Sequence, residues 1–384
     1  TMNEIRAERP YEDRLAFPEN RLHMDQDPQG GKRMHQRGTS LVANRRAMVM
    51  SLLALLMVLV LAACAGDTGE AGPAGPAGPA GAAGAAGPAG PAGEAAAAVD
   101  LGCIECHDDT TLITGKATAW GDSLHGTGEA YVRGTSAGCA GCHSGGAFSA
   151  MIAAGVSPDA VEAGDPNPTR QECRTCHEIH TTYTGADWAL ATTAPVAMYA
   201  FEGETYDGGE GNLCATCHEA RRGIGEAVDG TIEVDSTHWG PHHGPQSTML
   251  LGLGGGADVS GTAGAHYSQV EGTCVTCHLG DNANHSFEPD VAACQACHSG
   301  AEDFDIGGVQ TEVQAMLDEL GAALTAKGLL DAEGTMVVGI YPEAEAAALW
   351  NWIYVAHEDK SLGVHNPSYT KALLQAGLDA LAAG

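Results

Sequence analysis

The chain has 384 residues, with 49 acidic and 18 basic side chains and a formal net charge of −31. Residues 64–384 carry 42 of the acidic side chains and only 9 of the basic ones. Such a surface repels nucleic acid and anionic lipid and favours basic partner proteins or metal cations. A solvated acidic coat suited to high salt is the alternative explanation. Aromatic residues make up only 5% of the chain, which is few for a core built from side chains alone.

Residues 1–63 combine a polar extension with an apolar segment. Residues 47–63 form a run of 17 without a charged side chain, borderline for a membrane span and well suited to a signal peptide. The run ends in Leu61-Ala62-Ala63-Cys64, which resembles the lipobox of bacterial lipoproteins. That resemblance implies that Cys64 is lipidated and becomes the mature N-terminus, and Ala65 after it points to the outer membrane. The alternative is an uncleaved anchor with an incidental cysteine.

Residues 64–98 contain ten consecutive triplets that begin with glycine, from Gly66 to Ala95. The strict period resembles a bacterial collagen-like segment. As a polyproline-type helix this stretch would reach roughly 90 Å, at about 3.1 Å per residue. Two interpretations stay open, a semi-rigid tether that holds the rest of the chain off a membrane, or a triple helix that makes the protein a homotrimer.

Residues 99–300 contain the unit Cys-X-X-Cys-His six times. Its cysteines are Cys103, Cys106, Cys139, Cys142, Cys173, Cys176, Cys214, Cys217, Cys274, Cys277, Cys294 and Cys297, and its histidines are His107, His143, His177, His218, His278 and His298. Two cysteines at this spacing form thioether bonds to the two vinyl groups of one haem, and the next histidine becomes the proximal iron ligand. Zinc sites and a disulfide framework are alternatives, but neither requires a histidine after every pair. The spacing predicts six covalently bound haem c groups.

We expect a mainly α fold with long irregular loops, organised around a haem stack, with little or no β-sheet. Each haem supplies a large flat apolar surface around which short segments pack. Beyond residue 300, apolar residues recur at helical spacing from Val309 to Leu324. A second helix is expected from Pro342 through Ala356, and a third after Pro367. Residues 301–384 are therefore predicted to be a helical segment that packs on the six-haem domain, residues 99–300.

Nine histidines outside residues 1–63 belong to no unit, enough to fill the distal position of six irons. The expected distal ligands are His125, His180, His242, His266, His285 and His365, with His238 and His243 in reserve and His357 exposed on a helix. One member of the cluster at residues 238–243 could instead hydrogen-bond a haem propionate. His180 and His285 follow a proximal histidine too closely to reach the far face of the same haem, so each should bind a neighbouring one. Bis-histidine ligation gives a low-potential iron with no open site, which suits electron transfer rather than substrate chemistry.

Residues 264–298 read GAHYSQVEGTCVTCHLGDNANHSFEPDVAACQACH. This run resembles the last two haem segments of cytochrome c nitrite reductase and its relatives, hydroxylamine oxidoreductase and octahaem tetrathionate reductase. In that superfamily a histidine ahead of the first unit and one between the units are distal ligands, which implies these roles for His266 and His285. The tail EDKSLGVHNPSYTKALL, residues 358–374, resembles the C-terminal segment that supplies another distal ligand, here His365.

The resemblance covers residues 235–384, whereas the first four units match by motif alone. Nitrite reductases bind their catalytic haem through a CxxCK unit, which this chain lacks. The hydroxylamine oxidoreductase type carries eight haems, and this chain has six units. The catalytic residues of that superfamily are therefore not carried over to this chain. The resemblance implies a scaffold that is retained for electron transfer.

The sequence favours an electron-transfer protein over an enzyme. We expect a lipid-anchored cytochrome, exported because c-type haem is attached outside the cytoplasm, that passes electrons along bis-histidine haems at the outer cell envelope to redox partner proteins or extracellular acceptors. One alternative is an oxidoreductase of nitrogen or sulfur oxyanions with one open haem, in which Arg221 or Arg222 holds the anion. Another is a subunit of a cytochrome filament.

Overall fold

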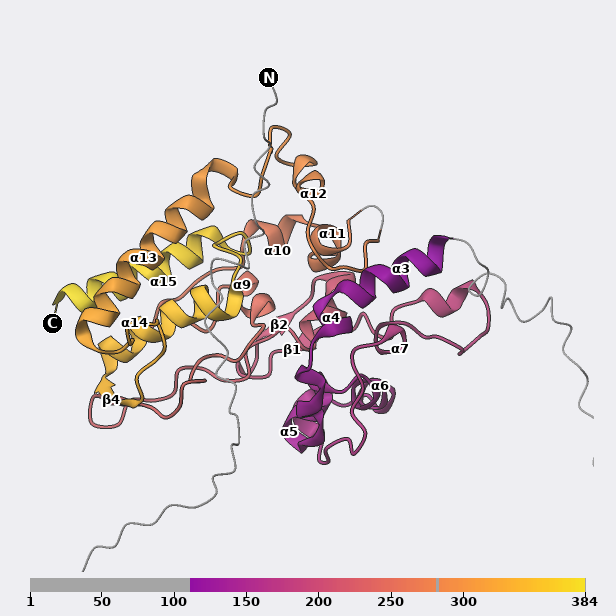
Figure 1. The fold of residues 1–384 in the computed structure, drawn as a ribbon, viewed down its shortest axis with the longest axis horizontal. Helices are drawn as coiled ribbons and strands as arrows, with labels where there is room; N and C mark the ends of the chain where they lie inside the picture. The colour runs from indigo at the N-terminus through magenta and orange to yellow at the C-terminus, as the bar shows by residue number, and fades with distance from the viewer. Residues whose placement is uncertain (1–110, 281–282, 384) are drawn as a thin grey trace, which may run out of the picture. The chain divides into compact units, whose positions relative to one another are not determined.

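The computed structural model describes residues 111–280 and 283–383 (Figure 1). The predicted signal peptide, the lipidated Cys64, the collagen-like segment and the first unit, Cys103–His107, lie outside the described residues. No helix in the described part of the chain is both long enough and apolar enough to cross a membrane.

This part of the chain is mainly helical, as predicted. Its β-structure is limited to two small antiparallel sheets, in line with the expectation of little or no sheet. Its elements up to residue 251 are α3 (Thr111–Asp122), α4 (Leu124–Thr127), η3 (Ala130–Thr135), α5 (Ala137–His143), α6 (Gly145–Ala154), η4 (Pro158–Ala160), α7 (Cys173–Cys176), η5 (Gly185–Trp188), β1 (Val196–Ala197), β2 (Thr205–Tyr206), η6 (Gly209–Gly211), α8 (Asn212–Ala215), β3 (Thr231–Val234) and α9 (Gln246–Leu251). The later elements are α10 (Ala265–Gln269), α11 (Cys274–His278), α12 (Val291–Gln295), η7 (Ile306–Gly308), α13 (Val309–Lys327), β4 (Gly339–Pro342), α14 (Glu343–Ile353), η8 (Tyr354–Asp359) and α15 (Pro367–Ala383).

The cysteine units lie on the short helices. The five units in the described residues each include or overlap one of α5, α7, α8, α11 and α12. Residues three apart on a helical turn lie on the same face, so the two cysteines of a unit are presented together. The remaining histidines lie on other elements and connections, with His125 on α4, His266 on α10 and His357 on η8.

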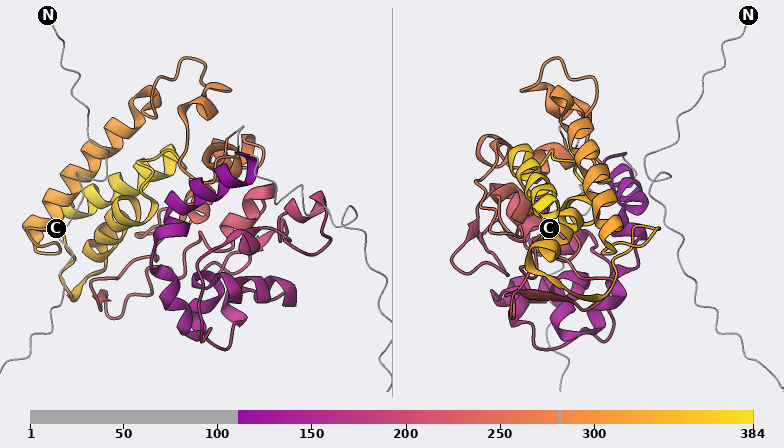
Figure 2. Two further views of the ribbon diagram at one scale, coloured as in Figure 1. Left: turned by 45° about the vertical axis from the view of Figure 1, so that its right-hand side comes forward. Right: turned by 90° about the vertical axis from the view of Figure 1, so that its left-hand side faces the viewer.

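Helices α13, α14 and α15 pack side by side (Figures 1 and 2). The predicted stripe on α13 is confirmed, because the helix buries Val313, Leu317, Leu320 and Leu324. Gly377 on α15 allows close approach, since a Cβ there would lie 2.8 Å from a methyl carbon of Leu320. The third predicted helix is confirmed as α15.

The second predicted helix ends earlier than expected. Helix α14 stops at Ile353, and the chain continues as one π-helical turn, η8, to Asp359. His357 lies on this turn half-buried, with its ring centroid 4.9 Å from that of Trp352. The prediction that His357 is exposed was therefore wrong, because the π-turn rotates it towards α14.

The largest hydrophobic core joins the three C-terminal helices to an earlier stretch of chain. Ile232, Val234, Trp239 and Met249 are buried among the helix residues. Strand β3 pairs with β4 from Thr231↔Pro342 to Val234↔Gly339, which ties this stretch to the start of α14. By contrast, the cluster beside the second, third and fourth units contains only Phe148, Met151 and Leu213 as buried members.

Candidate metal centres

In the described residues, five histidines of cysteine units each lie close to a histidine from elsewhere in the chain. The ring centroids are 5.9 Å apart in His143–His242, 6.1 Å in His218–His125, 6.2 Å in His177–His285, and 6.4 Å in both His298–His266 and His278–His365. Within residues 111–280 and 283–383, no three His, Cys, Asp or Glu side chains are grouped as for a metal ion.

These separations fit two imidazoles on opposite sides of one metal ion. An imidazole nitrogen binds a transition metal at about 2.0–2.1 Å, so two opposed rings would have centroids roughly 6.3 Å apart. The five observed separations, 5.9–6.4 Å, lie around that value. The cysteine pair that precedes each unit histidine supplies the thioether attachment that a c-type haem requires. The residues present therefore fit haem at each of these five centres.

The ring nitrogens are also in the state that a metal ligand needs. Nδ1 lies at 2.8 Å from the Trp188 carbonyl oxygen in His177, 2.8 Å from Phe287 O in His278, 2.6 Å from Val364 O in His266 and 2.6 Å from Ala283 O in His285. A carbonyl oxygen only accepts, so Nδ1 carries the hydrogen and Nε2 keeps its lone pair. Such outer hydrogen bonds orient metal-binding histidines.

Two further rings are held by side chains. His218 Nδ1 is 3.0 Å from Gln246 Oε1, and His365 Nδ1 is 2.6 Å from Asp359 Oδ1. The amide of Gln246 is fixed in orientation, because its Nε2 donates to the carbonyl oxygens of Glu358 and Asp359.

Burial keeps two of the rings neutral. It lowers the pKa of His125 to about 4, with His218 adding to the effect, and it lowers the pKa of His242 to about 4, with His243 adding to the effect. Both imidazoles are therefore uncharged at pH 7, and only an uncharged imidazole binds a metal.

His242 is selected from its cluster by the backbone. Its φ is +83°, a left-handed conformation that is uncommon outside glycine. The backbone N–H of Arg221 donates to Pro241 O at 2.9 Å and holds this turn. The two reserve candidates lie close to His242, and neither is paired with a unit histidine among the ring contacts of the described residues. The ring of His243 is 5.6 Å from that of His242, and its Nδ1 is 2.8 Å from Glu358 Oε2. His238 lines a cavity of about 250 Å³ with Arg221, Arg222 and His242.

His180 is placed on a loop after the third unit. Its φ is +62°, and its ring stacks on Tyr183 with centroids 5.5 Å apart. The first unit, with His107, lies in the part of the chain that the structure does not describe. The sixth pairing therefore stays a prediction without a geometric counterpart.

Several units lie next to one another. Cys142 Sγ lies 3.9 Å from Thr216 O, and Cys217 Sγ lies 4.0 Å from Cys142 O, which places the second unit beside the fourth. The fourth unit begins on α8, directly after η6, and η6 packs on α11. Helix α11, with the fifth unit, packs on α12, with the sixth. The second, fourth, fifth and sixth units thus form a continuous series, which sequence reasoning did not reveal because it depends on how distant segments pack.

The comparisons with known proteins are sparse. No family model matches the chain, and no curated protein matches it. Among solved structures, it is similar to the crystal structure of the outer cell wall cytochrome OcwA, with 24% identity and a TM-score of 0.41 over 70% of this chain and 48% of that one. The chain thus spans about half the length of that protein. A likeness at this level is too weak to transfer a function.

Proposed function

We propose that this protein is a six-haem c-type cytochrome that carries electrons and performs no substrate chemistry. The observation that supports it most strongly is that five cysteine units each present a histidine to a second histidine at 5.9–6.4 Å. The sixth haem is inferred from the first unit by its sequence alone.

In this proposal the residues have three roles. The paired cysteines form the thioethers, the unit histidines are proximal ligands, and His125, His242, His266, His285 and His365 are distal ligands, with His180 for the first unit. The chemistry supplied by bound haem is a reversible Fe(III)/Fe(II) couple. One electron taken from a reduced partner protein is thus passed to an oxidised partner or a ferric complex. With two histidines of the chain holding each haem, no bond to a substrate would form or break.

The arrangement of the units supports a route. Electrons would pass between the second, fourth, fifth and sixth units, which lie next to one another in that order. The third unit joins at the fourth, because Cys176 and Cys217 pack against the same buried cluster of apolar side chains. The route therefore has a branch at the fourth unit.

The oxyanion reductase alternative needs an open axial position. The cavity lined by Arg221, Arg222 and His238 lies beside His242, which already faces His143. Arg222 donates to the carbonyl oxygens of Gly240 and His238, and Arg221 donates to the hydroxyl of Tyr199. Both guanidinium groups therefore have partners within the chain, and we favour electron transfer over the enzyme.

The setting of the protein is part of the same proposal. The lipobox-like segment supports anchoring through Cys64 at the outer envelope, and the acidic surface supports a basic redox partner or a ferric acceptor. The collagen-like segment would serve as a tether or assemble a trimer. Sedimentation of the mature protein with and without residues 66–95 separates these two, because only a trimer loses two-thirds of its mass on deletion.

The proposal is tested on protein from a host that attaches c-type haem. Pyridine haemochrome analysis should give six haems per chain, and electron paramagnetic resonance (EPR) of the oxidised protein should show low-spin ferric iron. A colourless protein, or stoichiometric zinc, would refute the cytochrome assignment. Several equivalents of high-spin iron would refute bis-histidine ligation and favour the oxyanion reductase alternative.

A further inference from the structure

Asp359 is a buried carboxylate in an unusual position. It is the last residue of the π-turn η8, and the exposed fraction of its side chain is 0%. A buried charge is costly unless hydrogen bonds compensate it. The partners of the two carboxylate oxygens therefore determine what Asp359 does.

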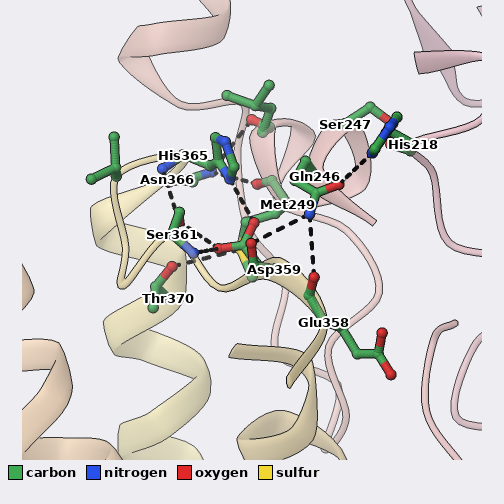
Figure 3. A network of polar contacts seen from close by, with 12 residues as sticks. His218, Gln246, Ser247, Met249, Glu358, Asp359, Ser361, His365, Asn366 and Thr370 are labelled. Carbon is green, nitrogen blue, oxygen red and sulfur yellow. Dashed lines mark hydrogen bonds and ion pairs between the residues drawn. The ribbon is translucent and has the colours of Figure 1, made fainter. Parts of the chain in front are cut away.

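One oxygen faces a proposed haem ligand and the other faces a serine (Figure 3). Oδ1 lies 2.6 Å from Nδ1 of His365. Oδ2 accepts from the Ser361 hydroxyl at 2.5 Å and from the Ser361 backbone N–H at 3.3 Å. Ser361 thus fixes the carboxylate, and the carboxylate fixes the ring of His365.

His365 differs in this respect from the other proposed ligands whose Nδ1 contacts are known. His177, His278, His266 and His285 turn Nδ1 to neutral backbone oxygens. His218 turns it to the neutral amide of Gln246. An ionised carboxylate accepts a hydrogen bond more strongly than a neutral oxygen.

The stronger acceptor changes the metal through the ring. A carboxylate that draws on the Nδ1 hydrogen makes the imidazole a more basic ligand. More electron density on the ligand stabilises Fe(III) relative to Fe(II). Building on the proposed function, we propose that Asp359 lowers the midpoint potential of the centre of His278 and His365 below those of the other described centres.

The position of this centre gives the effect a consequence. The fifth unit lies between the fourth and the sixth, because α11 packs both on η6, which leads into α8, and on α12. An electron that crosses it must pass the centre that is hardest to reduce. Asp359 therefore acts as a positioning residue that controls electron flow between the two ends of the series.

The neighbouring centre is tied to the same turn. Gln246 accepts from His218 at 3.0 Å and donates to the carbonyl oxygens of Glu358 and Asp359 at 3.2 and 3.3 Å (Figure 3). These bonds involve the backbone of the turn and not its carboxylates. Side-chain substitutions at residues 358 and 359 therefore leave the contact between Gln246 and His218 in place.

Three variants of the holoprotein test the proposal by spectropotentiometry and EPR. Asp359→Asn keeps the size of the side chain and removes its charge, so the lowest-potential component should rise. The reduction equilibrium should move at least tenfold, which is 59 mV for one electron, and one low-spin EPR signal should change. Ser361→Ala removes the hydroxyl that donates to Oδ2 and keeps the backbone N–H. The carboxylate should then accept more strongly from His365, so the same component should fall.

Glu358→Gln is the matched control. It removes a buried charge one residue away, and that carboxylate faces His243, a reserve candidate that the proposed function does not use as a ligand. The lowest component should therefore stay in place. An equal shift in this control, or an unmoved component in a six-haem Asp359→Asn protein, would overturn the role of Asp359. If Asp359→Asn loses a haem, the Ser361→Ala variant tests the proposal instead. A fall of the lowest-potential component supports the role of Asp359, and a rise or no change refutes it. A wild-type chain without haem would instead refute the proposed function.

Discussion

Replacing His285 with alanine should open one metal centre and leave the others closed. His285 follows the fifth unit in the chain, yet its ring lies 6.2 Å from that of His177 in the third. Its Nδ1 is bound to Ala283 O, so Nε2 is the ring nitrogen left for a metal. Alanine removes that nitrogen, while the bond from His278 to the carbonyl oxygen of Phe287 on the same segment does not involve the side chain at position 285.

We expect His285→Ala to open the ligand position of one haem out of six. Titration of the reduced protein with carbon monoxide should bind one equivalent more than wild type, and the oxidised variant should gain one equivalent of high-spin iron by EPR. His243→Ala is the matched control, because His243 is 72% exposed and its Nδ1 is bound to Glu358. It should bind no additional carbon monoxide. If His285→Ala keeps six haems and binds none either, the pairing of His285 with His177 is wrong.

Three further predictions test the core, the surface and the haem-free chain. Leu320→Ala should lower the free energy of unfolding by about 2–5 kcal/mol in denaturant titrations, because it leaves a cavity between α13 and α15; Val338→Ala, at an exposed position, should change it little. The rate of reduction by a cationic mediator should fall about tenfold or more as salt screens the acidic surface, and the rate with an anionic reductant should rise; equal salt dependence would exclude electrostatic steering. In hydrogen exchange, a chain without haem should keep protection in α13–α15 and lose it in α5–α7.

The sequence predicted the C-terminal helices because their signal is local. Apolar residues from Val309 to Leu324 repeat with the helical period, and that stripe faces the core. The end of α14 was missed because η8 depends on where its buried polar residues find partners. The pairing of β3 with β4 was missed because each strand has four residues and the two are far apart in the chain.

For the candidate site, the sequence predicted the cysteine units but not which histidines pair with them. The cysteine units are contiguous, so composition and spacing reveal them. The second histidine of each centre comes from a distant segment, so the sequence offered candidates but not partners. Nothing local distinguishes His242 from His238 and His243, because the choice depends on a left-handed backbone at one residue. The structure brings five of the expected distal histidines to a unit histidine, and their ligation stays a prediction.

The uneven distribution of the core explains why the haem-free chain should be only partly ordered. Around α13–α15, a continuous set of fully buried apolar residues can offset the conformational entropy of folding without help. Around α5–α7, the buried cluster is reduced to Phe148, Met151 and Leu213. The proposed centres join that region to distant segments, as His143 with His242 and His177 with His285. A metal that bridges two segments stabilises only the folded chain, so its binding free energy becomes folding free energy. Equal protection of α5–α7 without haem would show that the side chains alone hold this region together.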